Sequence, residues 1–191
     1  VARSYDKFFN YGELYKTKPE ALRFSLKFPV TAYRKENGFL ALLSYDKEND
    51  DLFIASKSTP DGPFALLARE IILKNTEDVA AIKEYLKKNN VTFVFECIDP
   101  VNDPHIIKYD KAKVVLLDIV NNTMSFEKYD FERLKKTAGE FGYEHKKKSC
   151  VIESWPELVE WMEVVSASDY KDDGEIIEGY VIEDQNGFMF K

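Results

Sequence analysis

Residues 29–45 read PVTAYRKENGFLALLSY, and this stretch decides the fold. Two runs rich in apolar residues, 29–33 and 39–45, flank the polar tetrapeptide Lys35-Glu36-Asn37-Gly38. Such runs, separated by a polar segment that ends in Asn-Gly, are typical of β-strands joined by a turn. A third apolar run, 51–55, follows a second polar segment. The sequence therefore predicts a strand-rich meander over residues 29–56, with Lys35 at the end of a strand.

The rest of the chain predicts a mixture of helices and strands. Apolar residues at helical spacing predict helices at 64–73, 77–89, 130–141 and 155–166. Ser154 followed by Glu157 predicts a capping box at the start of the last helix. Short apolar runs predict buried strands at 91–98 and 113–120. The strands predicted at 176–183 and 188–190 are joined by a segment containing Asn186-Gly187, which favours a tight hairpin.

Composition limits the classes of protein to which the chain can belong. With 191 residues, 45% of them hydrophobic and 32% charged, it has the composition of one globular domain. It has no apolar run long enough to span a membrane and no signal-peptide layout, so we expect a cytoplasmic protein without a membrane partner. Cys97 and Cys150 lack zinc-ligand spacing. The net charge of −7 argues against a protein that coats nucleic acid nonspecifically.

Several short motifs follow one another in a fixed order. Taken alone, Lys35-Glu36-Asn37-Gly38 is a turn with a flanking lysine, and this structural interpretation fits most such matches. The further elements are Ser56-Lys57-Ser58, Phe93-Val94-Phe95-Glu96, Lys113-Val114-Val115-Leu116-Leu117-Asp118, Glu178-Gly179-Tyr180-Val181 and Lys191. In order and spacing, this series resembles the covalent nucleotidyltransferase superfamily of ligases and capping enzymes.

The opening segment narrows the resemblance. Tyr5-Asp6-Lys7-Phe8-Phe9-Asn10, with Glu13, is similar to a segment that precedes the nucleophile in the phage-type RNA ligase 1 family and in the ligase domain of fungal tRNA ligases. The resemblance implies an α+β fold of antiparallel sheets flanked by helices, with the nucleotide site between the sheets. It also implies that residues 1–191 form one adenylyltransferase domain, and we expect the natural protein to continue beyond both ends.

The implied activity is that of an ATP-dependent RNA ligase. Lys35 would form a covalent lysyl-AMP, pass the AMP to an RNA 5′-phosphate, and a 3′-hydroxyl would then displace it. A lysine that attacks phosphorus must be neutral, and a free lysine has a pKa near ~10.4. Lys57, Lys191 and a bound Mg²⁺ or Mn²⁺ would supply the positive charge that favours the neutral amine and stabilises the phosphates.

The resemblance also assigns the remaining site residues. Lys35, Lys57 and Lys191 are the expected catalytic residues, and Glu96 and Glu178 are the expected metal ligands. The expected nucleotide-binding residues are Lys7, Glu36, Asn37, Gly38, Phe95, Glu96, Glu178 and Val181. The alternative for Glu96 and Glu178 is that each pairs with a lysine in a sheet, because an unpaired carboxylate is costly to bury.

Two departures from the family pattern leave other functions open. Asn37 stands where most of the superfamily has Asp, and the Arg-Gly element expected upstream is absent before Arg3. The alternatives are another covalent nucleotidyltransferase, such as a capping enzyme or a DNA ligase, and a noncatalytic nucleotide- or RNA-binding module. We expect no catalytic role for His105 or His145, and residues 145–148 are expected to form a solvated face. The expected partners are RNA ends and a fused or associated RNA end-healing kinase or phosphatase.

Overall fold

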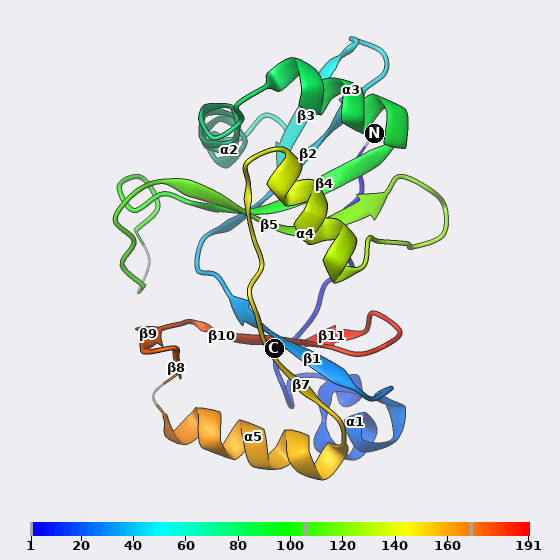
Figure 1. The fold of residues 1–191 in the computed structure, drawn as a ribbon, viewed down its shortest axis with the longest axis vertical. Coiled ribbons are helices and arrows are strands. Elements are labelled where there is room, and N and C mark those ends of the chain that lie inside the picture. The colour runs from blue at the N-terminus through cyan, green and yellow to red at the C-terminus, as the bar shows by residue number, and fades with distance from the viewer. Residues whose placement is uncertain (1, 105–106, 169) are drawn as a thin grey trace. The chain divides into compact units, whose positions relative to one another are not determined.

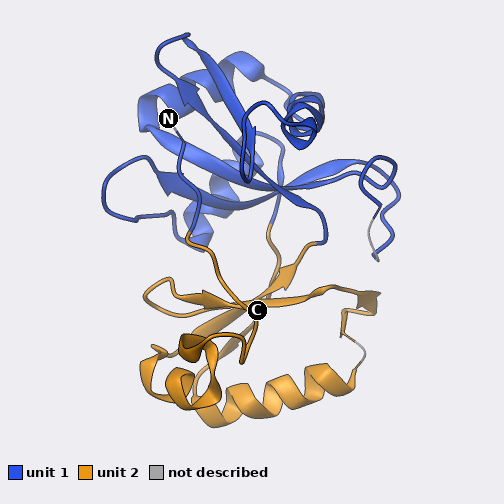
Figure 2. Cartoon of the chain, turned by 180° about the vertical axis from the view of Figure 1, so that it is seen from behind, with its two compact units in different colours: residues 1–5, 37–145 blue, residues 6–36, 146–191 orange. Residues whose placement is uncertain are grey.

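The chain folds into two compact units, each with its own sheet. The computed structural model describes residues 2–104, 107–168 and 170–191. Unit 1 comprises residues 1–5 and 37–145, and unit 2 comprises residues 6–36 and 146–191 (Figure 2). The chain passes from unit 2 to unit 1 between Glu36 and Asn37, inside the tetrapeptide that contains Lys35.

Unit 1 contains a five-stranded sheet in the order β3-β2-β4-β5-β6 (Figure 1). Its strands are β2 (Phe39–Asp46), β3 (Asp51–Ser56), β4 (Val91–Ile98), β5 (Lys113–Asn121) and β6 (Glu144–His145). All neighbouring pairs are antiparallel except β5 and β6. The helices of this unit are α2 (Pro63–Lys74), α3 (Val79–Asn89) and α4 (Phe131–Glu140).

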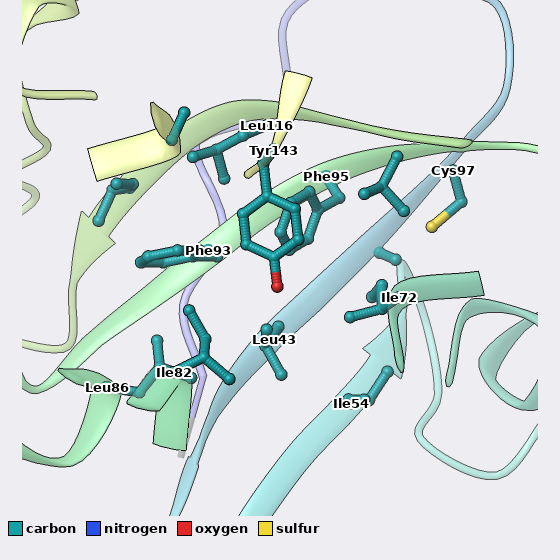
Figure 3. Close-up of a cluster of buried hydrophobic side chains, with 14 of the residues drawn as sticks. Leu43, Ile54, Ile72, Ile82, Leu86, Phe93, Phe95, Cys97, Leu116 and Tyr143 are labelled. Atoms are coloured by element: carbon teal, nitrogen blue, oxygen red, sulfur yellow. The ribbon is translucent and has the colours of Figure 1, made fainter. Parts of the chain in front are cut away.

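The core of unit 1 is built on alternate residues of β4. Phe93, Phe95 and Cys97 are fully buried and belong to one hydrophobic cluster with side chains of the helices, including Ile72 and Leu86. Figure 3 shows these rings and aliphatic chains packed around Tyr143. Alternation along a strand places Val94 and Glu96 on the opposite face of the sheet.

Unit 2 contains a four-stranded antiparallel sheet in the order β11-β10-β1-β7. Its strands are β1 (Val30–Lys35), β7 (Lys148–Ile152), β10 (Gly179–Glu183) and β11 (Met189–Phe190), and a separate hairpin is formed by β8 (Lys171–Asp172) and β9 (Glu175–Ile176). The helical segments are η1 (Tyr15–Thr17), α1 (Pro19–Ser25) and α5 (Trp155–Ala167). Leu22 of α1 and Leu158 of α5 cover one face of the sheet, where Ala32 and Ile182 are buried.

Most of the predicted elements are confirmed with shifts of one or two residues at their ends. The four predicted helices are α2, α3, α4 and α5, and the two predicted buried strands are β4 and β5. The terminal hairpin is also confirmed, since β10 and β11 pair through Ile182 and Phe190. Within the described residues, no helix is long and apolar enough to cross a membrane.

Three local predictions are wrong. The stretch 29–56 is not one meander, because β1 pairs with β10 and β7 whereas β2 pairs with β3 and β4. The strand predicted at 176–183 is interrupted, since Ile176 pairs in the hairpin and β10 begins only at Gly179. The capping box is absent, because Ser154 makes no side-chain cap bond.

Candidate active site

Lys35 is the last residue of β1, and its ammonium group is paired with Glu178. Lys35 lies opposite Gly179 in the β1–β10 register, so the residue before Gly179 comes close to it. Lys35 Nζ is 2.5 Å from Glu178 Oε2 and also donates to the carbonyl of Glu36 at 3.3 Å. The side chains of Lys35 and Glu178 are 20% and 35% exposed. The pair therefore remains accessible to small molecules.

The backbone around Gly179 brings Glu178 to this position. Gly179 has a backbone φ of +151°, a conformation that residues with a Cβ rarely adopt. Glu178 lies between the hairpin β8–β9 and the start of β10, outside both. The expectation of a carboxylate inside an apolar strand is therefore wrong for Glu178. Its lysine partner is the expected nucleophile itself.

In unit 1, Gly38 and Glu96 are joined directly. The Gly38 amide donates to Glu96 Oε1 at 3.0 Å. A Cβ at position 38 would lie 2.2 Å from the Cys97 carbonyl oxygen, so only glycine fits this close approach to β4. The Asn37 amide donates to the Tyr109 hydroxyl at 3.0 Å. Gly38 is thus required by packing inside the protein, whatever its contact with a nucleotide.

Two further titratable side chains of unit 1, Asp118 and Tyr5, have charged neighbours. Asp118 is almost fully buried and pairs with Lys128 Nζ at 3.2 Å. Burial raises the pKa of the Tyr5 hydroxyl well above its usual range, and the negative charges of Glu96 and Asp118 raise it further. Tyr5 therefore stays protonated and can donate a hydrogen bond at neutral pH.

The other expected residues of unit 1 differ in exposure. Lys57 follows β3 directly and is exposed. The Phe95 ring is fully buried in the core, 5.0 Å from the Tyr143 ring centroid. A contact between Phe95 and a nucleotide would therefore involve its backbone, and this role stays a prediction.

In unit 2, the segments that contain Lys7 and Lys191 are hydrogen-bonded to each other. The Lys191 amide donates to the Phe9 carbonyl at 3.0 Å, and the Lys191 carbonyl accepts from the Tyr11 amide at 2.6 Å. Lys7 and Lys191 are both exposed, and Lys7 Nζ is 4.7 Å from the Phe9 ring centroid. Two expected phosphate-binding cations thus lie on adjoining segments.

Val181 and Glu36 complete the expected set. Val181 of β10 lies opposite Tyr33 of β1. Tyr33 is two residues before Lys35 on the same strand, so alternation places Val181 on the face of the sheet that carries Lys35. Glu36 is buried, with 8% of its surface exposed.

The guanidinium of Arg3 has protein partners in unit 1. It donates to the carbonyls of Thr123, Met124 and Ser125, and it lies over the Phe126 ring. These bonds from Nη1 hold the loop at 123–125, which is a structural role.

Two buried charged groups of unit 2, Arg34 and Lys146, were not predicted from the sequence. Arg34 is buried and bound to the hairpin β8–β9. Lys146 is also buried, 3.4 Å from Glu183 and 4.3 Å from the Tyr33 ring centroid, so the prediction of a solvated face at 145–148 is wrong for it. His145 packs edge-on against Phe131, and His105 lies outside the described residues. A charged residue inside the apolar strand 30–35 was the available signal for Arg34.

The residues present fit a divalent cation only in part. Within residues 2–104, 107–168 and 170–191, no three His, Cys, Asp or Glu side chains gather in a way that could hold a metal ion. Mg²⁺, however, usually keeps several waters and binds through one or two carboxylates together with substrate phosphates. The half-exposed carboxylate of Glu178 fits this mode of binding.

Comparison with known proteins identifies the family. The RNA ligase family model matches residues 1–191. The chain belongs to the RNA ligase family. This confirms the predicted resemblance. A tRNA ligase of Candida albicans is 26% identical over 211 residues, which cover 95% of this chain and 25% of that protein.

Solved structures of RNA ligases confirm the predicted fold class, α+β with the covalent nucleotidyltransferase architecture. An archaeal ATP-dependent RNA ligase has a TM-score of 0.67 at 13% identity, with 99% of this chain and 48% of that chain covered. A mutant of the Naegleria gruberi RNA ligase with ATP and Mn has a TM-score of 0.71 at 15% identity, covering 98% and 55%. This RNA ligase family member thus spans about half the length of the structures it matches.

Proposed function

We propose that this chain is the adenylate-accepting core of an ATP-dependent RNA ligase and that Lys35 is its nucleophile. The observation that carries the proposal is the position of Lys35 at the end of β1, paired with Glu178, in a chain that matches the RNA ligase family throughout. The similarity to a tRNA ligase, and to an RNA ligase solved with ATP and Mn, supports ATP, a divalent cation and RNA as ligands.

The reaction has three steps. The neutral Lys35 amine attacks the α-phosphorus of ATP, a P–N bond forms, and pyrophosphate leaves with the electrons of the broken P–O bond. An oxygen of the RNA 5′-phosphate then attacks the lysyl-AMP and releases Lys35. Finally, the 3′-hydroxyl attacks the activated 5′-phosphorus, loses its proton to solvent, and AMP leaves. Positioning and charge stabilisation supply most of the catalysis in such transfers.

The Lys35–Glu178 ion pair corresponds to the resting form. An ammonium group has no lone pair for attack, so Lys35 has to lose its proton before the first step. Glu178 then loses its partner, and its carboxylate oxygens are of the kind that bind Mg²⁺ or Mn²⁺. Such an ion would neutralise negative charge on the phosphates when bound.

The other expected residues would bind the nucleotide and the leaving group. Lys7, Lys57 and Lys191 are exposed cations suited to phosphates. The base and ribose would lie against Glu36, Asn37, Gly38, Phe95, Glu96 and Val181. We propose that residues 1–191 function as one adenylyltransferase domain.

Labelling with nucleotides tests the proposal. Protein incubated with radiolabelled ATP and Mg²⁺ is expected to keep the label through denaturation, whereas labelled GTP leaves none. Lys35→Ala should abolish labelling, and the matched control Lys135→Ala, which removes an exposed lysine of α4, should retain it. Label from GTP alone would favour a capping enzyme, and labelled Lys35→Ala would show that the nucleophile is another residue.

Asn37 favours one alternative, a noncatalytic nucleotide- or RNA-binding module, because the superfamily's usual negative charge is missing there. The Asn37 side-chain oxygen is buried and has no hydrogen-bond partner within the described part of the chain. This alternative predicts saturable ATP binding without a covalent adduct.

The cellular context is part of the same proposal. A reducing compartment such as the cytoplasm suits the free thiols of Cys97 and Cys150. A kinase or phosphatase that prepares RNA ends, fused or associated, would supply the 5′-phosphate and 3′-hydroxyl that the ligase consumes. Activity on RNA with these ends, and inactivity on RNA with a 2′,3′-cyclic phosphate, would support this order of reactions.

A further inference from the structure

Arg34 precedes Lys35 on β1 and projects to the opposite face of the sheet, because successive strand residues alternate. Only 8% of its surface is exposed. An arginine stays charged in proteins, so its burial requires partners that match its charge and its donors. Burial by itself lowers the pKa of the guanidinium, but hydrogen bonds to Glu175 and Asp172 outweigh it and the pKa is raised.

In the described part of the chain, the guanidinium of Arg34 donates its hydrogen bonds to the hairpin β8–β9. Arg34 Nε and Nη2 donate to Asp172 Oδ2 at 3.1 and 3.0 Å, and Nη2 also donates to the Asp172 carbonyl at 3.2 Å. Nη1 donates to Glu175 on the other strand of the hairpin. One guanidinium thus holds both strands, a fork-like geometry that a lysine cannot reproduce.

Asp172 links the hairpin to two more strands of the sheet. Its Oδ2 accepts from the Ser149 hydroxyl of β7 at 3.0 Å. The Tyr180 hydroxyl of β10 also interacts with it: burial raises the pKa of Tyr180 to about 12, and the charge of Asp172 and a hydrogen bond to it contribute. Arg34 and Tyr180 are partners in the β1–β10 register. The contact is therefore built into the sheet at the end nearest Lys35.

The hairpin leads directly to Glu178. Its two strands have two residues each and, among the described residues, pair only with each other. An isolated two-stranded hairpin is marginally stable in water. After Ile176, the Ile177 amide donates to the Tyr170 carbonyl at 2.9 Å, and Glu178 follows and pairs with Lys35. The position of Glu178 thus depends on how firmly the hairpin is fixed.

We propose that Arg34 is a positioning residue for the reaction of Lys35: by fastening the hairpin β8–β9 to β1, it sets where the Glu178 carboxylate lies relative to the Lys35 ammonium group. The two neighbouring cations of β1 have different roles. Arg34 binds the hairpin β8–β9 on one face of the sheet, and Lys35 pairs with Glu178, which follows the hairpin, on the other face. This inference rests on the proposed function, because it assigns Arg34 a role in forming lysyl-AMP.

Hydrogen exchange measured on the whole chain tests the anchoring. Arg34→Gln is expected to raise the exchange of amides in segment 171–178 by about tenfold or more, because a buried fork of hydrogen bonds is lost. Arg34→Lys should do nearly the same, since it keeps the charge but not the geometry. Arg23→Gln, an exposed arginine on α1 of the same unit, is the control and should leave the segment unchanged. Wild-type exchange in Arg34→Gln would overturn the proposal.

A double-mutant comparison tests the link to catalysis. Arg34→Gln should slow lysyl-AMP formation about tenfold or more in the wild-type background and much less in a Glu178→Gln background, because the two residues act on one event. Glu178→Gln alone should leave segment 171–176 protected, which shows that Arg34 acts on Glu178 and not the reverse. Equal losses in both backgrounds, or loosened exchange in Glu178→Gln, would refute the positioning role.

The outcomes separate the two proposals. If the wild-type chain forms no lysyl-AMP, the proposed function is wrong. If the wild type forms it and Arg34→Gln forms it at the same rate, the function stands and the role of Arg34 is wrong.

Discussion

Alternate residues of β4 in unit 1 and the last two residues of β1 in unit 2 are different kinds of side chain. In unit 1, β4 contributes Phe93, Phe95 and Cys97 to a continuous hydrophobic cluster. In unit 2, the end of β1 carries Arg34, buried and ion-paired, and Lys35, paired with Glu178. Apolar packing dominates this face of the first sheet, and oriented charge is concentrated at the end of β1 in the second.

This difference predicts where substitutions will affect stability and where they will affect chemistry. Loss of a ring from a close-packed core lowers stability by several kcal/mol, because the cavity closes only in part. Loss of one partner from a hydrogen-bonded ion-pair network also moves the groups that depend on its geometry. We therefore expect unit 1 to be sensitive in unfolding experiments, and the end of β1 to be sensitive in activity.

The largest effect is expected for Phe93→Ala. Phe93 is fully buried and contacts the rings of Tyr85, Phe95 and Phe141, so its truncation should lower the free energy of unfolding by about 3–5 kcal/mol. Phe24→Ala is the matched control, because Phe24 is 82% exposed and its truncation should cost less than about 0.5 kcal/mol. Denaturant titration measures both values. Equal losses would contradict the view that this core dominates unit 1.

Gly38→Ala should cause the next largest loss in the free energy of unfolding. The new Cβ would lie 2.2 Å from a backbone oxygen of β4, which cannot rotate away, so we expect a loss of about 1–3 kcal/mol. Gly139→Ala in α4 makes the opposite prediction. No atom lies within 4 Å of its added Cβ, and alanine favours a helix over glycine by up to ~1 kcal/mol. Thermal unfolding should therefore shift down for the first variant and up for the second. A stabilised Gly38→Ala would show that space at this turn is not limiting.

Ser149→Ala probes the charged end of unit 2. It removes one hydrogen bond to Asp172 while Arg34 keeps its own, so the free energy of unfolding should fall by about 1 kcal/mol. Ser168→Ala, which removes an exposed hydroxyl at the end of α5, should be nearly neutral. A loss of several kcal/mol for Ser149→Ala, measured by denaturant titration, would mean that the network holds unit 2 together as the core holds unit 1.

The smallest effect concerns the two thiols. Burial raises the pKa of Cys97 and of Cys150, and in Cys150 the charges of Asp172 and Glu157 add to it. A raised pKa means less thiolate, so both should react slowly with iodoacetamide at pH 8, and Cys97 more slowly because it is fully buried. The contribution of these protonated thiols to the free energy of unfolding is complete below the ordinary thiol pKa of ~8.5 and declines as the pH rises beyond it. Rapid modification of Cys97 in the native protein would contradict its place in the core.

Local patterns in the sequence predicted most elements but not how the strands pair. Apolar spacing was sufficient for the helices, β4 and β5, because burial on one face imposes a period that the sequence retains. The predicted pairing of β1 with β2 was wrong. A polar segment ending in Asn-Gly has the same local sequence whether it joins two paired strands or leads the chain into another sheet. That choice depends on β10, more than 140 residues away in sequence.

Site residues were predictable from the sequence only where they belong to a motif of the family. Lys35 and Glu178 were singled out by the resemblance, and the structure places them in contact. Arg34 and the hairpin it holds were missed, although Asp173-Gly174 is a strong turn signal between two short strands. Two-residue strands are too short for alternation to be recognised, and an ion pair between residues 34 and 172 leaves no local pattern. The roles of Lys57, Lys191, Glu96 and the remaining nucleotide contacts stay predictions.

The central claim is that Lys35 becomes covalently bound to AMP. The most direct measurement is the intact mass of the protein after incubation with ATP and Mg²⁺, followed by peptide mapping of the modified residue. The account predicts the added mass of one AMP, located on Lys35 and absent from Lys35→Ala. An unmodified protein that nevertheless binds ATP, or an adduct on another lysine, would contradict it.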